Sequence, residues 1–252
     1  MPKLTDSTME EKKLGGSNFS FSAKRLDELG ASEYTLGFIA VDVSSSMYGK
    51  EKDIERMLKL AISTCRRNPR ADNMMLMVLL FSTRFTHNVE EVHGFKPLPD
   101  INDSDYDGII KCGGGTPLFD AAFTGIKAVH TYATDLADND FLVNGVGFVI
   151  TDGEENNSSV GAKTVKDTMS ELLRSESLES FRPILIGFNT GVAGGLSSYL
   201  KAFRDDAGFD QYVDMITADE KTLARVGNFL SQSISSVSQS LGSGGPSQSI
   251  SF

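Results

Sequence analysis

Hydrophobic positions along the chain fall into two kinds of segment. Apolar runs of strand length, bounded by polar residues, predict strands buried within a sheet. These runs cover residues 35–41, 73–82, 143–151, 182–189 and 211–217. Between them, apolar residues recur at helical spacing, which predicts amphipathic helices. The helical segments cover residues 52–65, 116–133, 161–176, 196–208 and 219–241.

One further segment, residues 84–92, alternates apolar and polar positions and follows the 73–82 run after a very short turn. This pattern predicts an edge strand that runs antiparallel to its neighbour. The alternation of strands and helices elsewhere predicts an α/β fold, a doubly wound and mostly parallel sheet of the Rossmann-like kind with helices on both faces. In such a sheet the ligand crevice lies beyond the carboxyl ends of the strands.

The two ends of the chain differ in composition from the centre. Residues 1–32 are mixed and weakly patterned, so we expect an N-terminal extension that holds at most a short helix. Residues 242–252 are rich in Ser and Gly, which predicts a flexible tail. The 252 residues are 40% hydrophobic, which is enough for one large domain, and we assign it to residues 33–241.

The charge of the chain excludes some classes of partner. Asp and Glu number 34 against 24 Lys and Arg, a formal net charge of -10. Such a chain repels phosphates, so we expect no nucleic-acid partner and no membrane partner. Cys65 and Cys112 are far apart and lack metal-binding spacing, so we interpret them as reduced, buried thiols. The first residues lack the apolar core of a signal peptide, and we expect a cytoplasmic protein.

Oxygen-bearing side chains gather where the first predicted strand ends, in the stretch GFIAVDVSSSMYGK. Asp42, Ser44 and Ser46 occupy alternate positions there, so in an extended turn their side chains point the same way. Thr116 begins a helix in GGGTPLFDA, and Asp152 ends another strand in VITDGEEN. Two carboxylates and three hydroxyls form a set of hard oxygen ligands. Such a set suits Mg²⁺ or Mn²⁺.

Taken together, the D-x-S-x-S motif, the Thr of GGTPL and the Asp of TDGE resemble the von Willebrand factor A (VWA) domain over about residues 33 to 240. The resemblance implies a metal-ion-dependent adhesion site (MIDAS). In it Ser44 and Ser46 ligate the metal directly, and Asp42 and Asp152 act largely through bound water. Thr116 binds directly when a ligand is engaged and through water otherwise. A six-stranded sheet of order 3-2-1-4-5-6 is also implied, with residues 84–92 as the antiparallel edge strand.

Such a site is expected to bind a protein rather than to catalyse a reaction. Neutral hydroxyls leave the cation electrophilic, so that an open coordination position attracts a carboxylate from a partner's Asp or Glu. The chain resembles stand-alone bacterial VWA proteins of the tellurium-resistance type. By that likeness it is an adaptor in a stress-response or phage-defence system, with a kinase or a phosphatase as its partner. A second likeness, to VWA proteins that dock an acidic residue beside an AAA+ ATPase, implies that class of partner instead.

Three other functions stay open at this stage. One is a Mg²⁺-dependent phosphoryl-transfer enzyme in which Asp42 is the nucleophile. That chemistry usually needs a second acid two residues further on, where this chain has Ser44, and we expect no enzyme. The second is a co-subunit of an AAA+ ATPase or chelatase-like complex. The third is a structural or oligomer-forming subunit in which residues 219–241 pack on a neighbour, although the last helix of the family normally covers its own sheet.

The roles of the residues around the predicted site are also open. Glu154 and Glu155 follow Asp152 directly, and they either tune the field of the site or belong to a solvated acidic loop. Met47 and Tyr48 follow the serines, and they either border the contact face or pack under the loop at residues 93–115.

Overall fold

A computed structural model describes residues 7–188, 191, 195–215, 220–243 and 250–252. These residues form a mixed α/β fold around one sheet of eight strands. The strands are β1 Met9–Lys13, β2 Ser20–Lys24, β3 Glu33–Asp42, β4 Met74–Phe81, β5 Val89–Pro97, β6 Leu142–Thr151, β7 Ser180–Phe188 and β8 Gln211–Met215. They lie in the order β1-β2-β5-β4-β3-β6-β7-β8. Neighbours from β4 to β8 run parallel, whereas β5 is antiparallel to β4 and β1 is antiparallel to β2.

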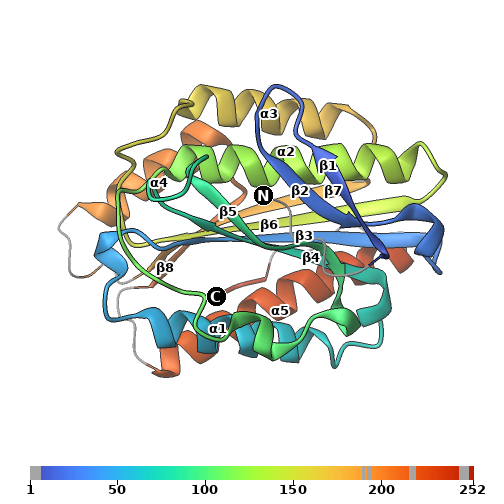
Figure 1. Ribbon diagram of the computed structural model, residues 1–252, viewed down its shortest axis with the longest axis horizontal. Coiled ribbons are helices and arrows are strands. Elements are labelled where there is room, and N and C mark those ends of the chain that lie inside the picture. Colours follow the sequence, from blue (N-terminus) through green and yellow to red (C-terminus); the bar gives the residue numbers. More distant parts are fainter. Residues whose placement is uncertain (1–6, 189–190, 192–194, 216–219, 244–249) are drawn as a thin grey trace.

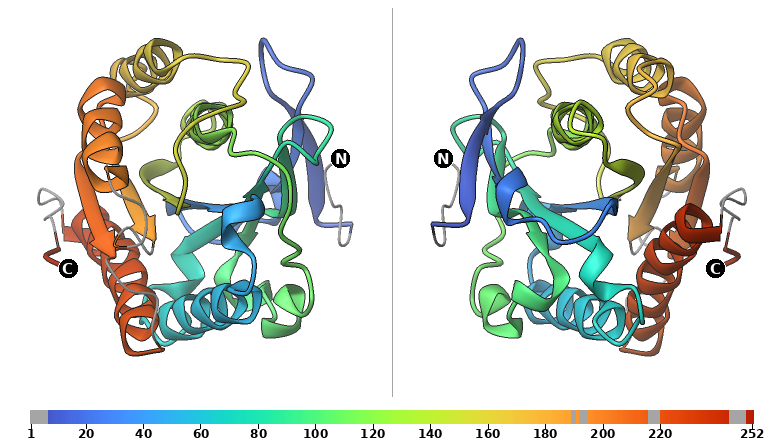
Figure 2. Two further views of the ribbon diagram at one scale, coloured as in Figure 1. Left: turned by 90° about the vertical axis from the view of Figure 1, so that its left-hand side faces the viewer. Right: turned by 90° about the vertical axis from the view of Figure 1, so that its right-hand side faces the viewer.

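Helices cover both faces of this sheet. They are α1 Glu51–Cys65, α2 Leu118–Ala137, α3 Ala162–Arg174, α4 Leu196–Ala207 and α5 Glu220–Ser243. Figure 1 shows α2, α3 and α4 on one side of the sheet and α1 with α5 on the other, and Figure 2 shows the same three layers from both ends. Each side has its own hydrophobic core, because alternate residues of the central strands point to opposite faces.

The prediction of six strands is wrong, because β1 and β2 extend the sheet. The six expected strands do lie side by side in the order β5-β4-β3-β6-β7-β8. However, β2 pairs in parallel with β5, so the antiparallel strand is not an edge strand. That strand also begins later than expected, at Val89, and runs through Pro97 into the segment predicted to be a loop.

The strands β1 and β2 are too short to be predicted from a pattern of hydrophobic positions. Each has five residues, and β2 joins the core only through Phe21 and Ala23, which are fully buried. Between them, the backbone N–H and the hydroxyl of Ser22 donate to the buried carboxylate of Glu91 in β5, at 2.7 and 2.6 Å. These two bonds offset part of the cost of burying a carboxyl group. The extension at residues 1–32 is therefore part of the sheet where it is described.

The last helix and the end of the chain pack on the same molecule. Val226, Leu230 and Ile234 of α5 are fully buried in the core that α5 shares with α1. The ring of Phe252 meets the ring of Phe229 edge-on at 5.6 Å between centroids. The predicted flexible tail at 242–252 lies largely outside the described residues. Among the described helices, none is long and apolar enough to cross a membrane.

Pairing between β3 and β6 positions the predicted site. Val41 lies opposite Ile150 in this parallel register, so Asp42 and Thr151 end neighbouring strands at the same edge. Asp152 follows Thr151 directly. The expected convergence therefore occurs at the carboxyl ends of the two central strands, β3 and β6.

Gly94→Ala tests the attachment of the two additional strands. A methyl group at Gly94 would overlap the backbone of Ser22, so β2 cannot keep its pairing with β5. We expect the free energy of unfolding to fall by about 3 kcal/mol, as for severe overpacking. Urea unfolding measures this. Gly15→Ala, in the turn between β1 and β2 where a methyl group meets nothing within 4 Å, is the control. Equal stability of the two variants would contradict the described pairing.

Candidate metal centre

Asp42 lies buried beneath the candidate site. Its side chain is fully buried at the end of β3, and both carboxylate oxygens accept hydrogen bonds. The backbone N–H of Ser44 donates to Oδ1 at 2.8 Å, and the hydroxyl of Thr151 donates to Oδ2 at 2.6 Å. Burial raises the pKa of Asp42 to about 6, against the opposing effect of these bonds. Asp42 thus fixes the turn that carries the serines to the end of β6.

The two outer serines of the motif meet Asp152. The hydroxyls of Ser44 and Ser46 lie 3.0 Å apart. The Ser46 hydroxyl in turn donates to Oδ1 of Asp152. Residues Ser45–Met47 form a single 3₁₀ turn, which aims Ser44 and Ser46 at the same point. Ser44 is almost fully buried, whereas Ser46 is exposed at the rim.

Thr116 approaches the same point from the third loop. A methyl group built on Gly153 would lie 2.9 Å from the Thr116 hydroxyl and 3.6 Å from the Ser46 hydroxyl. Only a residue without a side chain therefore leaves these two hydroxyls facing a shared space. The structure brings together all five residues predicted from the sequence, Asp42, Ser44, Ser46, Thr116 and Asp152. Their metal-ligating role stays a prediction.

The run of glycines before Thr116 allows its loop to come this close. Gly114 has a left-handed backbone with φ of +79°, and a methyl group there would lie 2.7 Å from the Ser82 hydroxyl. The carbonyl of Gly114 accepts from the backbone N–H of Ser45 at 3.0 Å. Gly114 therefore has a backbone conformation that residues with a side chain rarely adopt, and it also contacts the loop of the serines directly.

A polar hollow of about 340 Å³ lies over these residues, with Ser44, Ser46, Thr116, Gly153 and Glu154 among its lining. Within the described part of the chain, no cluster of three or more His, Cys, Asp or Glu could hold a metal ion. The hydroxyls of Ser44, Ser46 and Thr116 line the hollow, and the carboxylates of Asp42 and Asp152 are hydrogen-bonded to the two-serine segment behind it. This donor set fits a hard divalent cation and does not fit one that prefers nitrogen or sulfur ligands.

Glu155 caps a helix. Its carboxylate accepts from the backbone N–H of Phe119 in the first turn of α2 at 3.0 Å. It also accepts from the backbone N–H groups of Asn157 and Ser158 in its own loop. Glu155 therefore supplies an acceptor for an otherwise orphaned N–H at the start of α2. Both acids line the hollow, but Glu154 is exposed whereas Glu155 is half-buried and engaged by these N–H groups.

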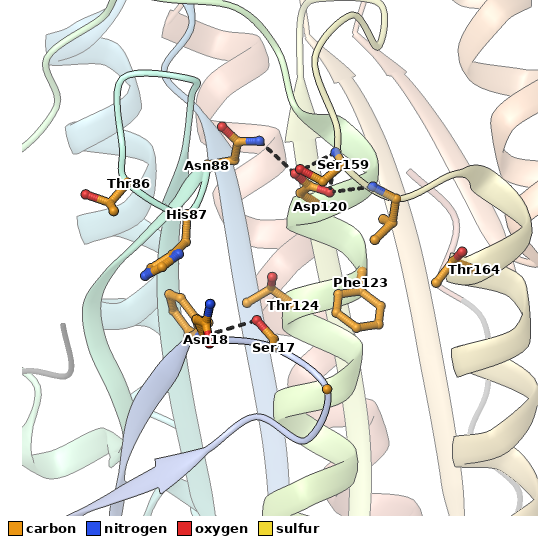
Figure 3. Close-up of a pocket in the computed structure, with 13 residues that line it drawn as sticks. Ser17, Asn18, Thr86, His87, Asn88, Asp120, Phe123, Thr124, Ser159 and Thr164 are labelled. Carbon is orange, nitrogen blue, oxygen red and sulfur yellow. Dashed lines mark hydrogen bonds between the residues drawn. The ribbon is translucent and has the colours of Figure 1, made fainter.

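Two further residues tie the loop of Asp152 to that of Thr116. The backbone N–H of Thr116 donates to the side-chain oxygen of Asn156 at 2.9 Å. In return, the backbone N–H of Asn156 donates to the carbonyl of Thr116 at 3.2 Å. Asp120 accepts from the backbone N–H groups of Ser159 and Val160 and from the side chain of Asn88 (Figure 3). Thr116 and Asp152 are thereby held in one connected unit.

Sequence reasoning missed Thr151 and Asn156, which position the candidate ligands, and it named Glu155 without its capping role. Their one signal is composition, since VITDGEENNSS concentrates acceptors in a loop beside a helix start. The sequence left the roles of Met47 and Tyr48 open, and the structure shows that the two residues have different surroundings. Met47 is fully buried in the core, and Tyr48 is 65% exposed beside the site.

Comparison with known proteins shows the fold. No family model matches the chain, and no curated protein matches it. Among solved structures, the PilB minor pilin from Streptococcus sanguinis matches at 14% identity with a TM-score of 0.60, over 89% of this chain and 66% of that one. The pilus adhesin SpaC from Lactobacillus rhamnosus GG, in its open conformation, matches at 10% identity and 0.60, over 85% and 31%. Proximal thread matrix protein 1 from the mussel byssus matches at 17% and 0.52, over 81% and 47%.

The chain shares its α/β fold with these proteins. It spans about two thirds of the PilB chain and less than half of the other two. At these identities the likeness concerns the fold alone.

Glu155→Ala tests the capping role of this acid. The change removes acceptors from the first turn of α2 and from residues 157 and 158, so we expect the free energy of unfolding to fall by about 2 kcal/mol. Glu154→Ala, which removes an exposed acid of equal charge, is the control and should leave stability nearly unchanged. Urea unfolding of both variants decides between a cap and a solvated acidic loop, because only the cap makes their stabilities differ.

Proposed function

We propose that this chain is a VWA-type domain that binds a divalent cation, Mg²⁺ or Mn²⁺, and through it a carboxylate of a protein partner. The observation that carries the proposal is the convergence of three loops on one polar hollow. Ser44 and Ser46 come from the end of β3, Thr116 from the start of α2, and Asp152 from the end of β6.

In this proposal the five residues have different roles. Ser44, Ser46 and Thr116 hold the cation through their hydroxyls, and Asp152 borders it from the side of β6. Asp42 acts from below, because its two oxygens are engaged by Ser44 and Thr151. The bound cation supplies a positive charge that neutral hydroxyls do not cancel. A partner carboxylate is the natural ligand for such a charge.

The surface beside the hollow supports a protein as the ligand. Tyr48 is one of the few large apolar side chains of the described residues that are strongly exposed. An amphipathic aromatic ring beside a polar site is typical of protein interfaces. Tyr48 would then contact the residues next to the partner's Asp or Glu.

The burial of Asp42 supports a binding role over phosphoryl transfer. A nucleophilic carboxylate must reach its substrate with a free oxygen, whereas both oxygens of Asp42 accept hydrogen bonds below the surface. We therefore infer that the domain is not an enzyme.

We further propose a cytoplasmic adaptor role in a stress-response or defence system, beside a kinase, a phosphatase or an AAA+ ATPase. The free thiols of Cys65 and Cys112 support a reducing compartment. The partner's class is proposed from the family resemblance of the site motifs.

Ser46→Ala tests the cation site directly. Removing one hydroxyl ligand should weaken Mn²⁺ and Mg²⁺ binding about tenfold or more, measured by isothermal titration calorimetry. Ser45→Ala is a matched control, because Ser45 is the exposed neighbour whose hydroxyl we place outside the ligand set. The proposal fails if the wild-type protein binds no divalent cation, or if the two variants bind equally well.

The partner's carboxylate is tested with the same pair of variants. In affinity capture from cell extract, the main partner should be retained by the wild type and by Ser45→Ala in Mg²⁺. It should be lost with EDTA and with Ser46→Ala, because the cation makes the contact. A partner that survives both treatments would place the interface on another surface.

A further inference from the structure

A lysine lies beside the proposed cation site and shares one of its carboxylates. The ammonium group of Lys50 donates to Oδ2 of Asp152, whose other oxygen accepts from Ser46. The same ammonium lies 3.4 Å from the backbone carbonyl of Ser46. The side chains of Lys50 and Asp152 are 16% and 5% exposed, so this is a mostly buried ion pair. No role in the predicted ligand set accounts for this positive charge.

The fold holds Lys50 in this place. Its backbone N–H donates to the carbonyl of Met47, and its own carbonyl accepts from Asp53 and Ile54 in the first turn of α1. The ammonium also lies 5.4 Å from the centroid of the Phe188 ring, at the end of β7. A cation over an aromatic face is attracted by the electrons of the ring. Lys50 is thus directed at Asp152 from a fixed backbone and with a second partner.

This arrangement has an electrostatic consequence for any cation held by Ser44, Ser46 and Thr116. The cation and the ammonium would share the negative charge of Asp152 at close range in a partly buried site. Like charges in such a setting repel each other strongly, because little water screens them. Each one therefore weakens the hold of Asp152 on the other.

We propose that Lys50 competes with the divalent cation for Asp152 and thereby lowers the affinity of the site for the cation. This inference rests on the proposed function and specifies its regulation. Occupancy of the site then follows the free concentration of divalent cations instead of being permanent. Partner binding through the cation follows the same concentration.

The experiment compares the wild type and four variants by isothermal titration calorimetry with MnCl₂ and with MgCl₂. Lys50→Met removes the charge, and Lys50→Gln removes the charge but retains a donor for Asp152. Both should bind the cations about tenfold more tightly than the wild type, because the repelling charge is gone. Lys50→Arg retains the charge and should bind like the wild type.

Lys52→Met is the matched control, since Lys52 is an exposed residue of α1 two positions away. Its loss changes the net charge equally but should leave affinity nearly unchanged, because water screens exposed charges. Circular dichroism establishes that each variant is folded, and Lys50→Gln replaces Lys50→Met if the latter does not fold.

The outcomes separate this inference from the proposed function. If the wild type binds a cation and the two neutral variants at position 50 bind it equally or more weakly, competition by Lys50 is wrong and the cation site stands. Tightening in Lys50→Arg or Lys52→Met equal to that in Lys50→Met would likewise overturn it. If none of these proteins binds a cation, the proposed function itself fails.

Discussion

One buried carboxylate joins the two central strands of the sheet to the loop that carries the serines. Asp42 ends β3, accepts from Thr151 at the end of β6, and accepts from the backbone of Ser44. Burial of a charge without partners is costly, so the position of this carboxylate dictates that both donors stay where they are. The register of β3 and β6 and the first turn after β3 are thus coupled, and the candidate site depends on that coupling.

The same constraint explains why Asp42 and Asp152 have different roles in the candidate site. Asp42 cannot face a ligand without losing its internal bonds, so its part in the site is to position others. Asp152 meets the hydroxyl of Ser46, which lines the hollow, and its carboxylate is already shared between Ser46 and Lys50. Both carboxylates among the five predicted ligands are therefore already hydrogen-bonded or paired, and the other three ligands are neutral hydroxyls. A cation held in this way keeps most of its positive charge for a partner.

Patterns in the sequence predict those parts of the molecule that depend on neighbours along the chain or on a shared sheet edge. The fully apolar β4 is recognisable because it is buried on both faces, and Asp42 and Asp152 converge because parallel strands end together. The strand β2 is invisible in this way, since its burial depends on Glu91 and on pairing with β5. Glu155 and Lys50 belong to the same class, because their partners are set by loop conformations that no periodicity encodes.

The three loops of the candidate site are also bonded to one another through their backbones. Ser45 N donates to the Gly114 carbonyl, Gly113 N donates to the Val43 carbonyl, and Asn156 N donates to the Thr116 carbonyl. The candidate ligands therefore already face one another, and a cation would not have to gather them. When little free energy is needed to order the ligand side chains, the other contributions to the binding free energy decide the affinity of the site. Here the largest remaining contribution is charge, because the hydroxyls are neutral and the carboxylate of Asp152 is paired with Lys50. Under the proposed competition, the balance between Lys50 and Asp152 governs the affinity of the site for a cation more directly than the geometry of its hydroxyls does.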